Sequence, residues 1–434
     1  MFKLQVELWK IIKHYFPGLI PLLRQRLDMR HQGYITYENH VLLFVRILGA
    51  VFQIESMRGI SEDLNRTACI ENISQMLGLE GKLTELPHWS TINNYLEKLR
   101  AEELEEIIPE LVNRLTRMRT FENSRIRDKY WQILVDATHL YTFEEPHCEH
   151  CLVREFKNKQ SDVVRREYYH VVLEAKLLIL GKVVISISTE FIENESPNVS
   201  KQDCELKAFY RLANKLKARF PRLPMCLCMD SLYAADPVFS LCKKNNWAYI
   251  IRFKDGSIKS VSEEFHALKE MEASQSWTRT EESITLQYKY VLGVPYKTHT
   301  LNVVECHQSD KAHPFVFITE LPITRRNCEQ FVVHGRNRWK IENEGFNTQK
   351  NHGYNLEHMF SKNYTAMKNH YYLIQIGHMI SQLLEAGLRR LRALASLAAS
   401  RIIADVKESF RNTTLNEEDV KTVNQRTQYR FSQA

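Results

Sequence analysis

The spacing of apolar residues predicts that the first part of the chain is helical. Over residues 1–120, apolar positions recur three and four residues apart, which places them on one face of a helix. One such run consists of Val41, Leu42, Val45, Leu48 and Val51. Residues 1–23 predict an amphipathic helix, and residues 102–119 predict another. We therefore expect an all-helical N-terminal domain over residues 1–125.

One part of this region is a candidate for DNA binding. Ser90 or Thr91 can cap a helix that runs toward Leu99, because their hydroxyls accept hydrogen bonds from the free N–H groups of a first turn. Together with a short helix that begins near Gly59 and an intervening segment, it can form a helix-turn-helix-like reader of DNA. The alternative is a plain helical bundle, and the apolar pattern fits both.

After residue 125 the apolar pattern changes to that of strands. Three apolar runs come first, and the second and third flank Gly181 as in a hairpin: residues 131–136, 168–179 and 183–192. A helix capped by Ser200, a strand, a helix with Pro237 in its first turn and another strand follow: residues 201–220, 225–230, 236–245 and 247–253. This order predicts a three-strand meander followed by α/β crossovers, and therefore a mixed sheet.

Residues 257–335 predict a small β-rich insertion into this α/β domain. One short helix and three strand-like runs lie at residues 263–272, 283–292, 298–306 and 315–319. The chain then returns to helix, and residues 364–395 predict one long helix. We therefore expect a split α/β domain over residues 126–256 and 336–400, followed by a polar C-terminal tail over residues 401–434 that ends in a loose stretch.

Two aspartates end apolar runs of the predicted sheet. Asp136 ends the first run and Asp230 ends the fourth. Side chains at strand ends meet at the ligand-binding edge of an open α/β sheet when their strands are neighbours. Convergent carboxylates repel one another unless a cation lies between them, and Mg²⁺ prefers such oxygen ligands. The alternative for each aspartate alone is a strand-end cap or a salt bridge.

A third acidic residue lies in the helical stretch at residues 336–350. Four side chains share one face of an α-helix here because they are spaced four residues apart. They are Arg338, Glu342, Phe346 and Lys350. A carboxylate flanked by cations can bind a metal ion while the cations bind phosphates. The alternative is a salt-bridged surface helix.

Together these stretches resemble the DDE transposases of bacterial insertion sequences, in the IS-four group, whose catalytic domain is RNase H-like. The resemblance covers residues 125–400 and depends on three motifs. They are Leu-Val-Asp-Ala-Thr at 134–138, Met-Asp-Ser-Leu-Tyr at 229–233 and Arg-Trp-Lys-Ile-Glu at 338–342. The order of predicted strands and helices, with a β-rich insertion before the last acid, also matches that fold.

The resemblance implies a catalytic site and a mechanism. Asp136, Asp230 and Glu342 would hold two Mg²⁺ ions, with Mn²⁺ as an alternative. A water molecule would attack the phosphodiester at the element end, and the freed 3′-hydroxyl would then attack target DNA. Arg338 would contact phosphate near the scissile bond. The other two DNA-binding candidates are Lys350 and Tyr354.

The chain departs from the family pattern at two positions near the glutamate. The pattern has a tyrosine where this chain has Gly335. It has a lysine where this chain has Gln349, with Lys350 one place later. The functions of the family's tyrosine and lysine therefore do not transfer directly to this chain.

Glu344 competes with Glu342 for the role of third acid. The two side chains would point roughly 200° apart on an α-helix, so both cannot serve one site. Glu342 is the better candidate because it keeps the four-residue spacing to Arg338.

The charge pattern is that of a polyanion-binding protein with a modest net charge. The chain has 59 Lys and Arg against 52 Asp and Glu, a formal net charge of +7. The surplus gathers in residues 114–129, 201–222 and 336–368, although solvated helix faces give the same pattern. The family implies terminal inverted repeats and target DNA as partners, and a homodimer in the synaptic complex. The alternatives are a DNA-binding regulator derived from a transposase and a non-transposing RNase H-like nuclease.

Composition bears on the compartment of the protein. The 14 glycines and 12 prolines are too few for a collagen-like or a Pro/Gly-rich disordered chain. No stretch is apolar enough to span a bilayer, and residues 1–23 do not form a signal peptide. Nine scattered cysteines, an odd number, suit a reducing compartment. We therefore expect a cytoplasmic protein with no membrane partner.

The loop after the first predicted strand contains a cysteine pair. Its sequence is His-Cys-Glu-His-Cys at residues 147–151. The spacing of Cys148 and Cys151 is that of half a Zn²⁺ site. A full site would use both histidines with strained local geometry, or a distant group such as Cys204. A reduced pair in a plain loop and a redox role are the alternatives.

Overall fold

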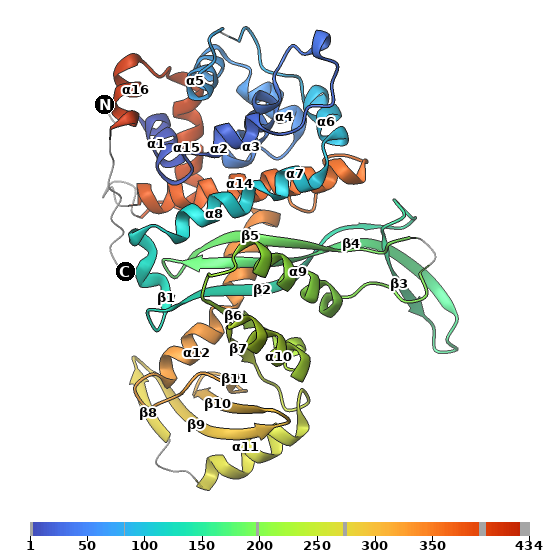
Figure 1. Ribbon diagram of the computed structural model, residues 1–434, viewed down its shortest axis with the longest axis vertical. Helices are drawn as coiled ribbons and strands as arrows, with labels where there is room; N and C mark the ends of the chain where they lie inside the picture. The colour runs from blue at the N-terminus through green and yellow to red at the C-terminus, as the bar shows by residue number, and fades with distance from the viewer. Residues whose placement is uncertain (1–2, 82, 197–198, 272–275, 390–395, 426–434) are drawn as a thin grey trace.

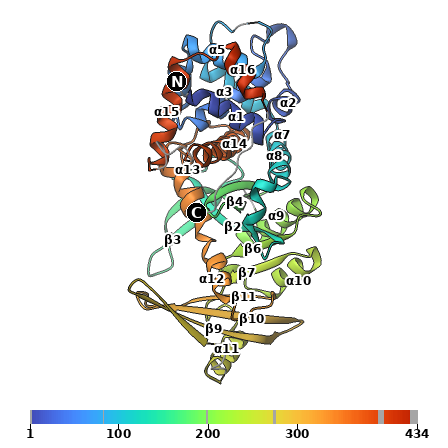
Figure 2. The same ribbon diagram turned by 90° about the vertical axis from the view of Figure 1, so that its left-hand side faces the viewer.

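The computed structural model describes the chain in five segments: residues 3–81, 83–196, 199–271, 276–389 and 396–425. Helices gather at one end of the molecule, and a single large sheet runs from beneath them to the other end (Figure 1). A view from the side shows the helical part, the central strands and the last strands one below the other (Figure 2). The predicted mixed α/β architecture with N-terminal helices is confirmed.

The N-terminal region consists of helices, as predicted. They are α1 (Leu4–Tyr15), α2 (Leu19–Arg24), η1 (Gln32–Tyr34), α3 (Asn39–Val51), α4 (Met57–Leu64), α5 (Thr67–Leu77), α6 (Trp89–Lys98), α7 (Ala101–Glu105), α8 (Ile107–Thr116) and η2 (Arg119–Ser124). The first predicted helix is divided into α1 and α2 at Pro17 and Gly18, because proline lacks the N–H that would continue the first helix. The predicted helix over residues 102–119 is likewise divided at Glu106.

The candidate DNA-reading helix is α6. Its N-cap is His88, whose ring accepts a hydrogen bond from the Ser90 N–H, so the cap precedes the predicted one. The whole of α5 lies between α4 and α6, whereas a helix-turn-helix joins its two helices by a turn of three or four residues. Because α6 also packs against α3 and the long α14 (Tyr364–Leu388), this region is a helical bundle.

The first strands form the predicted meander and crossovers. They are β1 (Arg125–Ile126), β2 (Tyr130–Phe143), β3 (Leu152–Lys157), β4 (Val163–Ile179), β5 (Val183–Ile192), β6 (Met225–Met229) and β7 (Ala248–Arg252). β4 is antiparallel to β2 and β5, whereas β6 is parallel to β2 and β7. The crossover helices are α9 (Glu205–Arg219), which begins after Cys204 and not after Ser200, and α10 (Asp236–Asn245).

β2 does not end at Asp136, contrary to the prediction. It continues to Phe143 because residues 137–143 pair with an equally extended β4. The polar residues Thr138 and His139 interrupt the apolar run, so the sequence pattern does not reveal this extension. β3 pairs with the first half of β4, and these two strands form a hairpin that projects from the rest of the sheet (Figure 1).

The predicted β-rich insertion extends the same sheet. It contains α11 (Lys259–Met271), β8 (Ser276–Glu281), β9 (Ile284–Tyr296), β10 (His299–Gln308) and β11 (Phe315–Thr319). β11 pairs with β7, so the strand order continues as β7–β11–β10–β9–β8. β8 is missing from the prediction because its residues are polar and mostly exposed.

The last helices return to the N-terminal ones. They are α12 (Cys328–Arg336), the π-helical η5 (Ile341–Asn347), α13 (Thr348–Asn351), α14, α15 (Ala399–Asn412) and α16 (Glu417–Asn424). α14 packs against β5 and against α1, α3 and α6, while α15 and α16 pack against α1. The first part of the predicted polar tail is therefore helical and packed, because one side of α15 is apolar and buried. Residues 390–395, predicted to extend α14, and residues 426–434 lie outside the described residues.

Buried apolar side chains form a core on each face of the sheet. The larger cluster joins the helical bundle to the sheet, and the smaller one lies between β6, α12 and η5. Cys226 and Cys228 share the face of the smaller cluster, as strand alternation predicts. In the part of the chain that the structure describes, no helix combines the length and the hydropathy needed to cross a bilayer.

Candidate active site

The three predicted acids line one pocket. Asp136 lies in β2, and Asp230 directly follows β6, the parallel neighbour of β2. Glu342 comes from η5, which lies against β2. The pocket has a volume of about 420 Å³, and its polar lining side chains are Asp136, Thr138, Asp230, Arg338, Glu342, Asn347 and Lys350.

Asp136 is held by the predicted arginine. The Arg338 Nη1 donates to Asp136 Oδ2, and the Ala137 N–H donates to Oδ1 over 3.1 Å. Burial raises the pKa of Asp136, the positive charge of Arg338 opposes this change, and the negative charges of Asp230 and Glu342 add to it. Asp136 is therefore a carboxylate whose negative charge is only partly compensated, which favours the approach of a cation.

Asp230 both caps a short helix at the end of its strand and lines the pocket. Its Oδ1 accepts a hydrogen bond from the Leu232 N–H over 2.9 Å, so it caps the short 3-10 helix η3 (Ser231–Tyr233). The same side chain lines the pocket. The cap fixes the orientation of the carboxylate and leaves the second oxygen available to a ligand.

The π-helical turn of η5 changes which side chains face the pocket. A π-helix bonds residues five apart, so its turns are wider than α-helical ones. Asn347, five residues after Glu342, therefore joins the pocket together with Phe346 and Lys350. The α-helical spacing predicted Phe346 and Lys350 but missed Asn347.

Glu344 lies elsewhere. It lines a different cavity, of about 710 Å³, together with Gln53, His352 and Arg389. The structure thus brings Glu342, and not Glu344, to the pocket of the two aspartates.

Glu205 is a fourth acid near this site that the sequence analysis missed. It stands in the first turn of α9, where its Oε1 accepts a hydrogen bond from the Tyr233 hydroxyl over 2.7 Å. Burial raises the pKa of Glu205, and the negative charges of Asp136 and Asp230 raise it further. Its position at the start of the crossover helix before Asp230 is the signal that could have indicated it.

Gln349 stands at the lysine position of the family pattern and Lys350 follows it, and the two side chains have different environments. Lys350 lies in the pocket, and its Nζ is 2.8 Å from a carboxylate oxygen of Glu357. Gln349 is fully buried, and its amide donates to Gln375 Oε1 over 2.8 Å. Lys176 of β4 approaches Gln349 Oε1 to 3.4 Å, so a buried lysine from the sheet faces the position where the family has its own.

The structure corrects one predicted DNA contact, Tyr354. Its ring is 3% exposed and packs edge-on against His378, with the ring centroids 5.0 Å apart. It lies outside the pocket of the three acids and on the wall of the cavity that contains Glu344. A tyrosine packed in this way has almost no surface with which to contact DNA.

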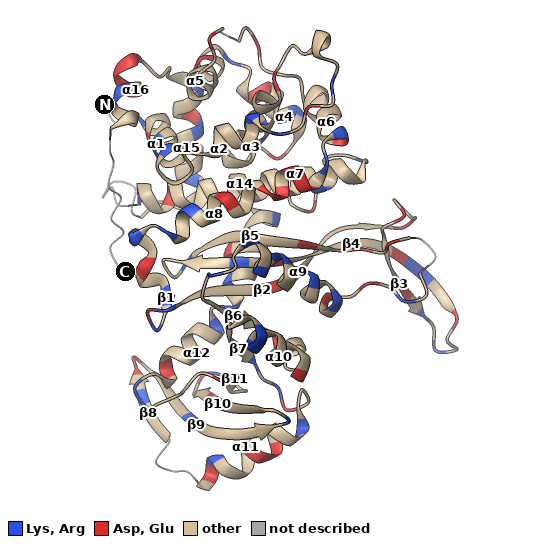
Figure 3. Cartoon of the chain, in the orientation of Figure 1, with Lys and Arg blue, Asp and Glu red and all other residues tan. Residues whose placement is uncertain are grey.

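The basic stretch in α9 is largely paired with acidic residues. Arg211 contacts Asp203 at 2.6 Å. Lys215 and Arg219 contact Glu105 at 3.1 Å and 2.8 Å. Figure 3 shows several basic positions along α9, the helix beside β5 and β2. Three of the seven basic residues in 201–222 therefore stabilise the fold through ion pairs and are less free to bind DNA.

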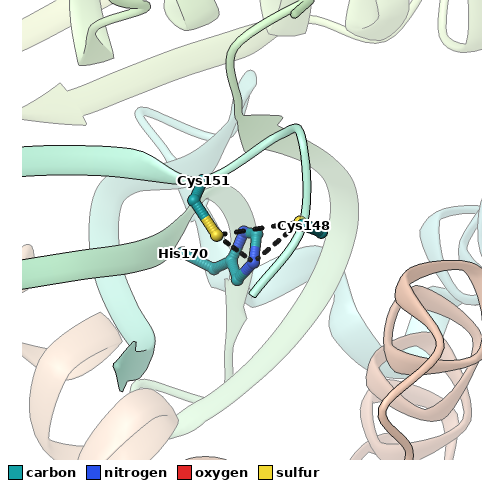
Figure 4. Close-up of side chains that lie close together, drawn as sticks. All are labelled: Cys148, Cys151 and His170. Atoms are coloured by element: carbon teal, nitrogen blue, oxygen red, sulfur yellow. Dashed lines mark hydrogen bonds between the residues drawn. The ribbon is translucent and has the colours of Figure 1, made fainter. Parts of the chain in front are cut away.

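A second group of ligand-type side chains lies at the end of β2. Cys148 and Cys151 come from the loop between β2 and β3, and His170 comes from β4 (Figure 4). The two Sγ atoms are 3.8 Å apart, and each is within 3.5 Å of His170 Nε2. A hydrogen bond from Cys148, assisted by His170, lowers the pKa of Cys151. The sequence predicted the cysteine pair but not His170; Cys204, the distant partner considered, is not part of the cluster.

Comparison with known protein families bears directly on the pocket of the three acids. Residues 127–380, more than half of the chain, match the family described as the transposase DDE domain. The chain belongs to the DDE transposase family. Its sheet is therefore the RNase H-like sheet of these enzymes, and its activity is DNA transposition.

One similar solved structure is the cryo-EM structure of the piggyBac transposase synaptic complex with hairpin DNA. The similarity covers 98% of the transposase described here and 83% of that chain, at 9% sequence identity and a TM-score of 0.41. No curated protein matches the sequence.

DDE transposases use divalent metal ions, and the donor set of the pocket fits such ions. Asp136, Asp230 and Glu342 offer carboxylate oxygens, the ligands that Mg²⁺ and Mn²⁺ prefer. Among the described residues, these three carboxylates do not all lie within 4.8 Å of one another.

Proposed function

We propose that this transposase belongs to a bacterial insertion sequence of the IS-four group, and that it binds the element ends and catalyses strand cleavage and strand transfer. The observation that carries the proposal is the pocket that Asp136, Asp230 and Glu342 line together. Their three elements are distant in sequence but adjacent in the fold. Family membership supplies the class of reaction.

Each acid has a definite task in this proposal. Asp136 and Asp230 present carboxylates from neighbouring parallel strands, and Glu342 presents a third from η5. These side chains would hold two Mg²⁺ ions, or Mn²⁺ in their place. When bound, the ions supply an activated nucleophile and stabilise the leaving oxygen. The protein contributes the spacing of the carboxylates, because two come from a rigid sheet.

Two cations of the pocket are suited to phosphate. Arg338 contacts Asp136 through Nη1, and a guanidinium has five N–H donors, which leaves others for a phosphate oxygen. Lys350 lines the same pocket and contributes a second positive charge. We assign Arg338 to the phosphate near the scissile bond and to the orientation of Asp136.

The surface beside the pocket offers further contacts to DNA. Trp339 is 47% exposed and lies between Arg338 and Lys340 in the sequence. An exposed aromatic ring next to cations is suited to stacking on an unpaired base. The proposed partners are therefore the terminal inverted repeats and target DNA, and two copies of the chain would act on two element ends. We assign the recognition of end sequences to the helical bundle of residues 1–125.

A cleavage assay on DNA tests this proposal. The protein is incubated with its own terminal repeats and Mg²⁺, and the nicks are mapped. We expect nicks at the repeat boundaries, and a loss of more than about 100-fold in Asp136→Ala and Asp230→Ala, because residues that merely support metal ligands already change activity about 10–100-fold. Binding of the repeat DNA, measured by mobility shift without Mg²⁺, should remain.

Glu344→Gln is the matched control for Glu342→Gln, since both remove one negative charge from η5. Only the change at Glu342 should abolish cleavage. Normal cleavage by Asp136→Ala would show that the site is misplaced. Binding of repeats without any nick would indicate a regulator, and nicks without strand transfer would indicate a nuclease.

A further inference from the structure

The Cys148, Cys151 and His170 cluster has the dimensions of a tetrahedral metal site. Bond lengths of about 2.3 Å for Zn–S and about 2.0–2.1 Å for Zn–N place ligand atoms about 3.8 Å (S to S) and about 3.6 Å (S to N) apart at tetrahedral angles. The observed separations are 3.8 Å between the two Sγ atoms, and 3.4 Å and 3.5 Å from them to His170 Nε2. The three ligand atoms thus have the separations expected of three corners of a tetrahedral zinc site.

The surroundings of the cluster favour a bound ion over hydrogen bonding alone. His170 is 1% exposed, and its Nδ1 has no hydrogen-bond partner among the described residues. Its other nitrogen, Nε2, faces the two sulfur atoms (Figure 4). Thiols are weak hydrogen-bond partners, so a metal–nitrogen bond would satisfy the buried Nε2 better than the two sulfur atoms do.

The ring of His170 is also fixed in place. It stacks on Tyr364 of α14 with the ring centroids 4.9 Å apart, and the Phe143 ring meets its edge at 6.1 Å. Ligand atoms that are positioned before the ion arrives are typical of a metal site. The cluster is therefore preorganised from three elements: the loop, β4 and α14.

We propose that Cys148, Cys151 and His170 bind one Zn²⁺ ion. Thiolate and imidazole ligands select zinc over the magnesium suited to the carboxylate pocket. The other histidines of the loop are engaged elsewhere: a ring nitrogen of His147 is 3.0 Å from the Lys362 carbonyl oxygen, and one of His150 is 2.9 Å from that of Asn194. Water would complete the fourth position, because no other Cys, His, Asp or Glu of the described residues joins the cluster.

The ion would fasten the root of the projecting hairpin. Cys148 and Cys151 directly precede β3, and His170 lies in β4 beyond the segment that pairs with β3. A metal bond between them fixes where the hairpin leaves the sheet. Arg154, Arg165 and Arg166 lie on this hairpin, and the last two pair with its acids Glu167 and Glu155. The zinc site would therefore set the direction of a charged arm.

Metal analysis and cobalt substitution test the proposal. We expect the purified, reduced wild-type protein to contain about one zinc ion per chain. The Cys148→Ser and His170→Asn variants should lose it. Cys204→Ser, which removes an exposed cysteine outside the cluster, is the matched control and should retain it. Asp136→Ala should also retain it, so failure of the proposed cleavage site leaves this result unaffected.

A spectrum of the wild-type protein avoids any doubt about the folding of variants. Co²⁺ added to the reduced apoprotein should produce thiolate-to-cobalt charge-transfer absorption and the visible bands of tetrahedral cobalt, and equimolar Zn²⁺ should abolish both. The proposal fails if the protein contains no stoichiometric zinc and gives no such bands. It also fails if Cys148 and Cys151 form a disulfide under reducing conditions.

Discussion

At the scale of single residues, a buried polar network supports the segment that carries Glu342. Lys176 of β4 is fully buried, and its Nζ donates to Gln375 Oε1 over 2.9 Å. Gln349 of α13 joins the same network. Glu174, two residues before Lys176, accepts a hydrogen bond from the Tyr371 hydroxyl over 2.9 Å. The network therefore ties β4 to α13 and α14 directly behind the pocket.

The buried lysine predicts a pH dependence of stability. Burial lowers the pKa of Lys176 from 10.5 to about 8. Between these values the unfolded chain binds more protons than the folded one, so stability rises with pH. Relative to Lys176→Met, the wild-type protein should gain about 1 kcal/mol in free energy of unfolding between about pH 7 and about pH 9.

Chemical denaturation of both proteins at the two pH values measures this difference, and the comparison cancels groups common to both. Lys182→Met removes an exposed lysine from the turn between β4 and β5 and is the matched control. A constant difference between the wild-type protein and Lys176→Met would contradict the prediction.

The residues that could be predicted differ from those that could not. Asp136, Asp230 and Glu342 have recognisable neighbours in the sequence, and the fold brings all three to one pocket. Glu205 has only its place at the start of a crossover helix, and His170 has no such signal, because each reaches its partners only through the packing of distant elements. Such contacts depend on three-dimensional register, which one sequence does not reveal.

At the scale of elements, the close approach of α12 to β11 explains a departure from the family pattern. Gly335 stands where the pattern has a tyrosine. A Cβ atom at Gly335 would lie 2.5 Å from the ring of Phe317, which is buried. No side chain fits this crossing, and the helix that leads to Arg338 therefore lies unusually close to the sheet.

Gly335→Ala should destabilise the protein by about 1–3 kcal/mol, the usual cost of overpacking a core. Gly345→Ala is the matched control, since a Cβ atom there meets Lys176 and Val184 at an ordinary 3.6 Å. Thermal unfolding of the two variants measures the effect. Equal melting temperatures would show that Phe317 can move away at no cost.

Element types were easier to predict than their ends. Apolar runs marked most strands of the sheet, because strands buried on both faces are apolar throughout. The π-helical turn of η5 was not predictable, since it differs from an α-helix only in the register of its backbone hydrogen bonds. That one change brings Asn347 into the pocket.

At the scale of the whole molecule, the C-terminal segment closes the structure onto its beginning. α14 passes so close to α3 that a Cβ atom at Gly377 would lie 2.5 Å from that of Ala50. Beyond α14, the Phe410 ring packs against Phe52 with the ring centroids 5.1 Å apart. Asn72 of α5 donates to the Phe410 carbonyl over 3.0 Å. Helices from both ends of the sequence thus form one bundle.

Removal of α15 and α16 should therefore unfold or strongly destabilise this bundle. A chain that ends at Ala398 loses four buried side chains of α15: Ile402, Ile403, Val406 and Phe410. Each contributes about 1.5–3 kcal/mol by burial, so the loss is a large fraction of typical total stability. A chain that ends at Gln425 keeps both helices and is the matched control. Circular dichroism during heating should show a much lower melting temperature only for the shorter chain, and equal temperatures would mean that the segment is the loose tail its polar composition suggests.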